Sequence, residues 1–121
     1  MKFTLELEND YLFSSTTGTV NTLEEMQQYA TAILNKTYKY GIKRILLDQT
    51  GLKNNTSSLD ASLLANSVEI DMAAVQGIRV ATIVTPNEYS IAVTYENALF
   101  NRSLNCKTFM EKEQAMQWLT S

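Results

Sequence analysis

The stretch ILLDQTGLKNNTSSLDASLLA, residues 45–65, decides the fold class of this chain. It opens with an apolar run that ends in the carboxylate of Asp48 and is followed by the residues QTG. This pattern predicts a buried strand that ends in a turn after Asp48. A polar loop follows, and Ser57 or Ser58 then supplies the N-cap of a helix expected over 59–75. The stretch is therefore a strand–loop–helix unit, the repeating element of α/β folds.

The flanking sequence adds similar units. Alternating apolar residues predict an opening hairpin of two strands, over 3–7 and 11–19. Helical periodicity, capping signals and short apolar runs predict the later elements. These are a helix from Thr22 to its stop at Gly41, a strand over 78–84, a helix over 89–101, a strand over 105–109 and a helix over 111–119. The order is β-β-α-β-α-β-α-β-α, so we expect one α/β domain over 1–121. Its sheet should be mixed, mostly parallel, with four or five strands covered by helices.

The composition narrows the function. The chain has no histidine and one cysteine, which removes Ser-His and Cys-His catalytic pairs and most metal sites, so we expect no catalytic residue, no metal and no cofactor. A net charge of -3 argues against nucleic acid as a partner. We expect a cytoplasmic protein with no membrane span, because the N-terminus has no signal-like apolar core and no run reaches about 18 apolar residues.

Two stretches resemble the STAS domain, in particular the small bacterial SpoIIAA-like proteins related to anti-sigma-factor antagonists. They are residues 45–65 and the closing stretch ALFNRSLNCKTFMEKEQAMQWL, residues 98–119. The resemblance implies a regulatory, non-enzymatic module with a phosphorylated serine before the second helix, at Ser57 here. This chain has Thr56 in place of the preceding aspartate and lacks the glycine that should follow. The resemblance extends to SpoIIAA-like proteins without the switch, which are similar to CRAL-TRIO-type lipid-binding folds.

The region around residues 50–60 holds the first group of candidate site residues. Asp48 and Thr50, at a strand's carboxyl end, either orient a ligand or cap their own turn. Ser57 and Ser58, with Thr56 before them, either accept a phosphoryl group or serve as simple N-caps. We expect this loop and helix start to dock an unidentified protein partner, while an enzyme using Asp48, Thr50 or Lys53 is the weakest reading because no nucleophile–base pair accompanies them.

The second group is apolar. The second and third expected helices carry more apolar residues than two helices packed on one side of a sheet require, and the candidates are Met72, Val75, Tyr89, Tyr95 and Phe100. These residues line a lipophilic pocket between the two helices, form a homodimer surface, or are simply well buried. The leading hypothesis is thus a protein-interaction module, and the alternative is a carrier of a small lipophilic ligand.

Overall fold

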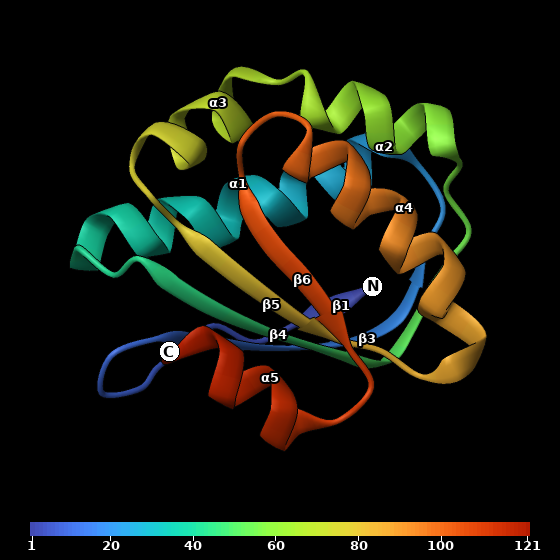
Figure 1. Cartoon of the computed structure of the whole chain (residues 1–121). Helices are drawn as coiled ribbons and strands as arrows, with labels where there is room; N and C mark the ends of the chain where they lie inside the picture. The colour runs from blue at the N-terminus through green and yellow to red at the C-terminus, as the bar shows by residue number, and fades with distance from the viewer.

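A six-stranded sheet forms the middle of the molecule in the computed structural model, which describes residues 1–121 (Figure 1). Its strands are β1 (Lys2–Phe3), β2 (Glu6–Leu7), β3 (Leu12–Val20), β4 (Arg44–Asn54), β5 (Arg79–Ile83) and β6 (Asn105–Phe109). The order is β1-β3-β4-β5-β6, and β2 also pairs with β3. Strands β3 to β6 are parallel, while β1 and β2 run antiparallel to β3. The predicted mixed, mostly parallel sheet is confirmed, with one strand more than expected because the first predicted strand is divided into β1 and β2.

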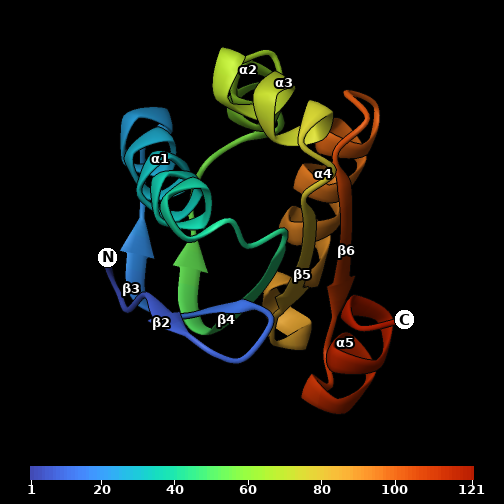
Figure 2. The ribbon, with the colours of Figure 1, turned by 90° about the vertical axis from the view of Figure 1, so that its left-hand side faces the viewer.

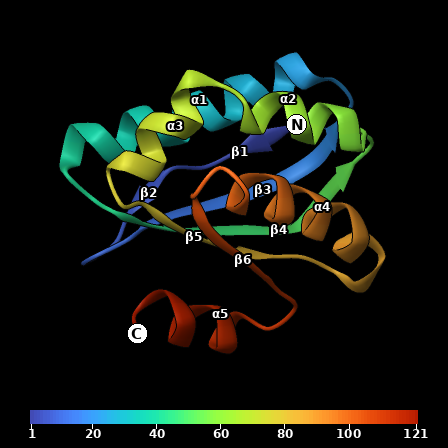
Figure 3. The same ribbon diagram turned by 45° about the horizontal axis from the view of Figure 1, so that its top comes forward.

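Four helices cover one face of this sheet and a single helix covers the other (Figures 2 and 3). The helices are α1 (Leu23–Tyr40), α2 (Ser58–Ala65), α3 (Val68–Val75), α4 (Tyr89–Phe100) and α5 (Lys112–Leu119), with a 3-10 turn, η1 (Pro86–Glu88), before α4. Helices α1 to α4 lie on one side and α5 lies alone on the opposite side. None of them combines the length and apolar character that a bilayer-crossing helix needs.

Helix α1 begins and ends where its capping signals predict. The Thr22 hydroxyl accepts a hydrogen bond from the Glu25 backbone N–H at 3.1 Å, which satisfies one of the free donors of the first turn. At the other end Gly41 adopts a left-handed conformation with φ of 67° and donates to the Thr37 and Tyr38 carbonyls. Local sequence therefore fixes both ends of the longest helix.

The sheet separates two hydrophobic clusters. The cluster under α1 to α4 contains sixteen buried residues, and the cluster under α5 contains five. Alternation along β4 explains the division, because Leu46 points toward α5 while its neighbours Ile45 and Leu47 point toward the four-helix side. We call these two sides the α5 face and the four-helix face.

Strand β4 does not end at Asp48, and that prediction is wrong. The strand continues to Asn54 because β3 goes on pairing with it as far as Val20. The register shifts where Asp48 to Gly51 lie opposite Ser15 to Thr17, which places one extra residue in β4. The letters QTG thus form part of a β-bulge, not a turn.

The single helix expected over 59–75 is also wrong, because it is divided into α2 and α3. Asn66 and Ser67 separate the two helices. The Ser67 hydroxyl accepts a hydrogen bond from the Ile70 N–H at 3.4 Å and so caps a new helix. Apolar residues continue through the break, which hides it from a periodicity analysis.

Candidate functional site

The start of α2 is held by a reciprocal pair of hydrogen bonds. The Ser57 hydroxyl oxygen accepts from the Asp60 N–H at 3.2 Å, and the Asp60 carboxylate accepts from the Ser57 N–H at 2.9 Å. This is a capping box, so Ser57 serves as the N-cap of α2, which is one of the two roles expected for it. Ser58 is the first residue of the helix and is exposed.

Thr56 faces inward, unlike the two serines that follow it. Its side chain is 8% exposed, and its hydroxyl pairs with the Tyr95 hydroxyl at 2.6 Å and donates to the Asn54 side-chain oxygen at 2.6 Å. Burial raises the pKa of Tyr95, which keeps this phenol protonated. Thr56 therefore joins the loop to α4 and is not accessible to a kinase or a docking partner in this conformation.

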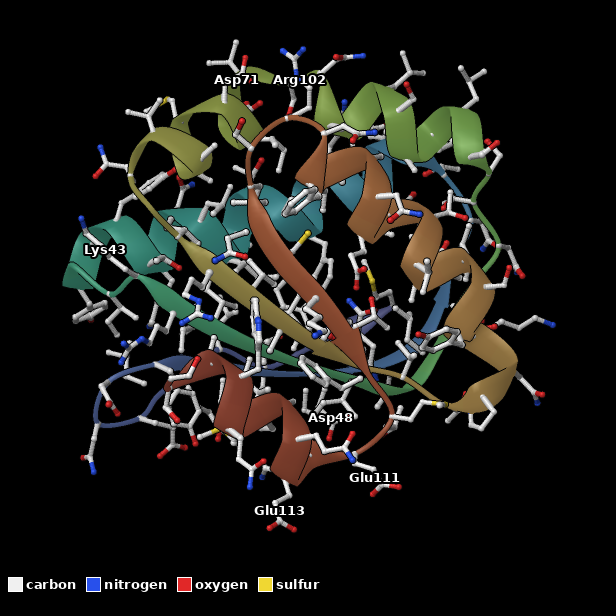
Figure 4. All side chains as sticks on the ribbon, viewed as in Figure 1. Lys43, Asp48, Asp71, Arg102, Glu111 and Glu113 are labelled. Carbon is white, nitrogen blue, oxygen red and sulfur yellow. The ribbon has the colours of Figure 1, made fainter.

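Asp48 and Thr50 lie away from the serines. The Asp48 carboxylate accepts from the Thr50 N–H at 3.0 Å and from the Thr50 hydroxyl at 2.7 Å, so the two residues bind each other inside the bulge. Asp48 lies on the α5 face, on the same side as Glu111, whereas Asp71 and Arg102 lie on the opposite side (Figure 4). The structure consequently does not gather the first group of candidates into one site.

An exposed apolar stripe runs along the outer side of each short helix. Its members recur at helical spacing and are all exposed: Leu59 and Leu63 on α2, and Val68, Met72 and Val75 on α3. We call these five residues the α2–α3 outer face. A hollow of about 210 Å³ indents it at Val68, Met72 and Val75, with Asp71 and Gln76 at its edge.

The second group of candidates is divided between surface and interior. Met72 and Val75 belong to the α2–α3 outer face, and Tyr89 and Phe100 are exposed on α4. Tyr95, in contrast, is buried and points toward the sheet, where it lines a cavity. The five residues therefore do not form one surface.

A cavity lies between the sheet and the helices of the four-helix face. It measures about 130 Å³, and 18 of its 25 lining residues are hydrophobic. Residues from α1, α2, α3, α4 and strands β4 to β6 surround it. Of the five residues expected to line a pocket between the second and third helices, only Tyr95 borders this cavity, which also reaches the sheet and α1.

Two carboxylates lie at the wall of this cavity. Glu88 accepts a hydrogen bond from the Asn54 N–H at 2.5 Å, and Glu96 accepts one from the Thr108 N–H at 2.5 Å. Each bond uses one carboxylate oxygen. Together they tie η1 and α4 to the ends of β4 and β6, and they fix the positions of both negative groups.

Cys106 contributes a thiol to the same cavity. The thiol donates to the Glu96 carbonyl at a sulfur–oxygen distance of 3.5 Å. Burial, followed by the charge of Glu96, raises the pKa of Cys106 to about 12. The thiolate is scarce at neutral pH, so this geometry favours a packing role over a nucleophilic one.

The cavity walls and the α2–α3 outer face contain residues that the sequence interpretation missed. Glu88 and Glu96 are the clearest. Glu96 carries a detectable signal, because it is an acidic residue beside the inward-facing Tyr95 and Leu99 on an otherwise apolar helix side. Leu63 and Val68 became assignable only once the break between α2 and α3 was known. No group of three or more histidine, cysteine or acidic residues is placed to hold a metal ion.

Comparison with known proteins relates the chain to solved structures. No protein-family model and no curated protein matches it. An uncharacterised protein of the DUF3478 family with a SpoIIAA-like fold, from Shewanella loihica PV-4, is similar with a TM-score of 0.54 and 22% identity, over 98% of this chain and 92% of that one. The Bacillus cell fate determinant SpoIIAA in its phosphorylated form aligns with a TM-score of 0.48 and 17% identity, over 97% and 98%. The chain therefore has the SpoIIAA-like fold that its resemblance to STAS domains predicted.

Proposed function

We propose that this chain is a non-enzymatic protein-interaction module that docks a partner through the α2–α3 outer face and the adjoining start of α2. The observation that carries the proposal is the exposure of five large apolar side chains on two consecutive short helices. Exposed apolar stripes of this kind usually mark contact surfaces. Residues 50–60, where a partner was expected to dock, comprise the end of β4 and the start of α2 and lead directly into this surface.

The charges of the surface indicate the chemistry of the partner. Helices α2 and α3 carry Asp60, Glu69 and Asp71 and contain no lysine or arginine. The nearest cation, Arg102, is already paired with Asp71 at 3.4 Å. We therefore expect the partner to present an apolar surface with a basic rim, since complementary charges speed association and exclude wrong partners.

A second copy of the chain is the less suitable occupant. A symmetric dimer through this surface would bring the carboxylates of one α3 toward those of the other, and Arg102, which is already paired with Asp71, is the one basic residue beside them. Like charges placed opposite each other weaken an interface. The homodimer hypothesis is therefore placed second to a different protein partner.

Regulation by phosphorylation is a separate part of the proposal. Ser58 is the better acceptor, because its hydroxyl is exposed and makes no hydrogen bond, whereas Ser57 is occupied by the capping box. A phosphoryl group there adds a charge of about -2 beside a basic partner. Intact-mass measurement of protein from its own cells should show an increment of about 80 Da, absent from Ser58→Ala.

The docking surface is testable by site-specific cross-linking. Met72 and Met110 form a matched pair, because they are 51% and 50% exposed and lie on different parts of the molecule. A photo-reactive residue at position 72 should capture a protein that the same residue at position 110 does not. With the purified partner, Met72→Ser should weaken binding about tenfold while Met110→Ser leaves it unchanged.

Two further measurements complete this test: the charge of the partner surface that is cross-linked to position 72, and the effect of salt on the affinity. A basic footprint, with affinity that falls as ionic strength rises, supports the proposed partner chemistry. Equal capture from positions 72 and 110, or an acidic footprint, contradicts it. Capture of a second copy of the chain from position 72 would replace the proposed partner with a homodimer.

The carrier hypothesis is a second candidate function, and the cavity is the observation in its favour. The cavity is mostly apolar and is lined by both α2 and α4, as that hypothesis requires. It also lies beneath the α2–α3 outer face and not within it, so both roles fit one molecule.

A further inference from the structure

The size of the cavity limits what it accommodates. At about 130 Å³ it is slightly smaller than an engineered core cavity of about 150 Å³ that binds benzene. A molecule of about one ring therefore fills it, whereas a long acyl chain does not fit inside. A compact molecule is the occupant that the volume admits.

The hydrogen-bonding groups along the wall are unevenly distributed between donors and acceptors. One Gln49 side-chain N–H donates to the Tyr29 hydroxyl at 3.2 Å, and the Tyr95 and Thr56 hydroxyls pair with each other, whereas the Thr82 and Thr108 hydroxyls have no protein partner. Glu88 and Glu96 each use one carboxylate oxygen and leave the other without a protein partner. The charged groups that remain for a ligand are therefore both acceptors.

No protein cation balances these carboxylates inside the cavity. Lys107 is the only basic residue among the lining residues, and its ammonium group lies 5.7 Å from the centre of the Phe109 ring. Phe109 packs with Trp118 under α5, so this charge points to the opposite side of the sheet. An anionic ligand would therefore meet two carboxylates without a compensating positive group.

We propose that the cavity binds a compact, ring-sized apolar molecule bearing a hydrogen-bond donor, with a protonated amine as the preferred donor. The ring packs among the apolar residues of α1, α2 and α4, and the amine donates to the free oxygens of Glu88 or Glu96. Carboxylates and phosphates are excluded by charge. This inference rests on the second candidate function and adds the chemical class of its ligand.

The test uses three probes of nearly equal shape, benzylamine, benzyl alcohol and benzoate, with the full chain. Affinities are measured by titration while the backbone amide NMR signals of cavity-lining residues such as Ala92 and Leu99 are followed. Benzylamine should bind at least about tenfold more tightly than benzoate, with benzyl alcohol between them. The double variant Glu88→Gln with Glu96→Gln keeps the acceptors to the Asn54 and Thr108 N–H groups, and it should reduce that preference to about threefold or less.

A cavity-filling variant shows whether the probes enter the cavity at all. Ala92→Leu adds three carbon atoms at the wall, so it should abolish binding of every probe while the melting temperature stays equal or rises. Benzoate binding as well as benzylamine would overturn the ligand class but leave a binding role for the cavity. If no probe binds the wild type, or if Ala92→Leu binds them unchanged, both the class and the carrier function fail, and the docking proposal is unaffected.

Discussion

On the α5 face of the sheet, five buried residues pack together around one helix, whereas on the four-helix face a core of sixteen buried residues borders a cavity of about 130 Å³. One helix laid along the strands needs only a few side chains to fill the space beneath it. Four helices of unequal length cannot all lie against a twisted sheet, and their side chains leave a gap. The larger core is therefore where binding is to be sought.

The largest expected effect is on the reactivity of the Cys106 thiol, which borders the cavity, when the folded and unfolded proteins are compared. Its pKa is raised from 9.0 to about 12, so at pH 8 the folded protein should react with iodoacetamide about a thousandfold more slowly than the urea-unfolded chain. Because the folded pKa is the higher one, the thiol's contribution to stability is complete below pH 9.0 and is lost as the pH approaches 12. Alkylation at nearly the unfolded rate would mean that the four-helix face opens frequently.

Substitution of two neighbouring leucines allows a direct comparison of the packing on the two faces. Leu46 is 0% exposed and belongs to the α5 cluster, while Leu47 is 9% exposed and borders the cavity. Leu46→Ala should lower the free energy of unfolding by about 4 kcal/mol and Leu47→Ala by about 2 kcal/mol, because a side chain beside a void has fewer contacts to lose. Urea denaturation measures both. Equal losses would remove the contrast between the two cores.

Substitutions at the N-cap of α2 measure how much the capping box stabilises the edge of the four-helix face. Ser57→Ala removes the capping box and should cost about 1 kcal/mol of unfolding free energy. Ser58→Ala is the matched control, since this hydroxyl makes no hydrogen bond, and it should change stability by less than about 0.5 kcal/mol. If both variants lose the same amount, the hydrogen bonds of Ser57 are not what stabilises the start of α2.

The N-cap position of α5, on the opposite face, is where we expect a substitution to increase the stability of the protein. Helix α5 begins after Glu111, which has extended backbone angles but makes no side-chain capping bond. Glu111→Ser places a hydroxyl there, with Gln114 three residues later completing a capping box. The expected rise in unfolding free energy is about 0.5 kcal/mol, and a decrease would show that Glu111 contributes an interaction of its own.

Sequence reasoning was most accurate where the determining contacts are local. The limits of α1 follow from Thr22 and Gly41, and the final strand over 105–109 was predicted with its observed bounds. It failed where distant pairing or packing decides the outcome. Pairing with β3 carries β4 through the bulge, and Thr56 is buried because Tyr95, 39 residues later in the chain, pairs with it.

The candidate site was predictable only in part for the same reason. The apolar surplus of the second and third helices was visible in the sequence, but the side on which each residue lies depends on the break between α2 and α3. The cavity is a property of several elements together, so no single stretch encodes it. Glu88 and Glu96 acquire their role only when η1 and α4 lie against the ends of β4 and β6.

The carboxylate of Glu96 also bears on the resistance of this protein to aggregation. Strand β6 is the last strand on its side of the sheet, and an unpaired backbone N–H along such an edge is where a strand of another molecule adds. Glu96 occupies the Thr108 N–H, and the opposite edge is interrupted because β1 and β2 are only two residues each. Neither margin offers a long template for an incoming strand, so we expect self-association into fibrils to require prior loss of α4 from β6.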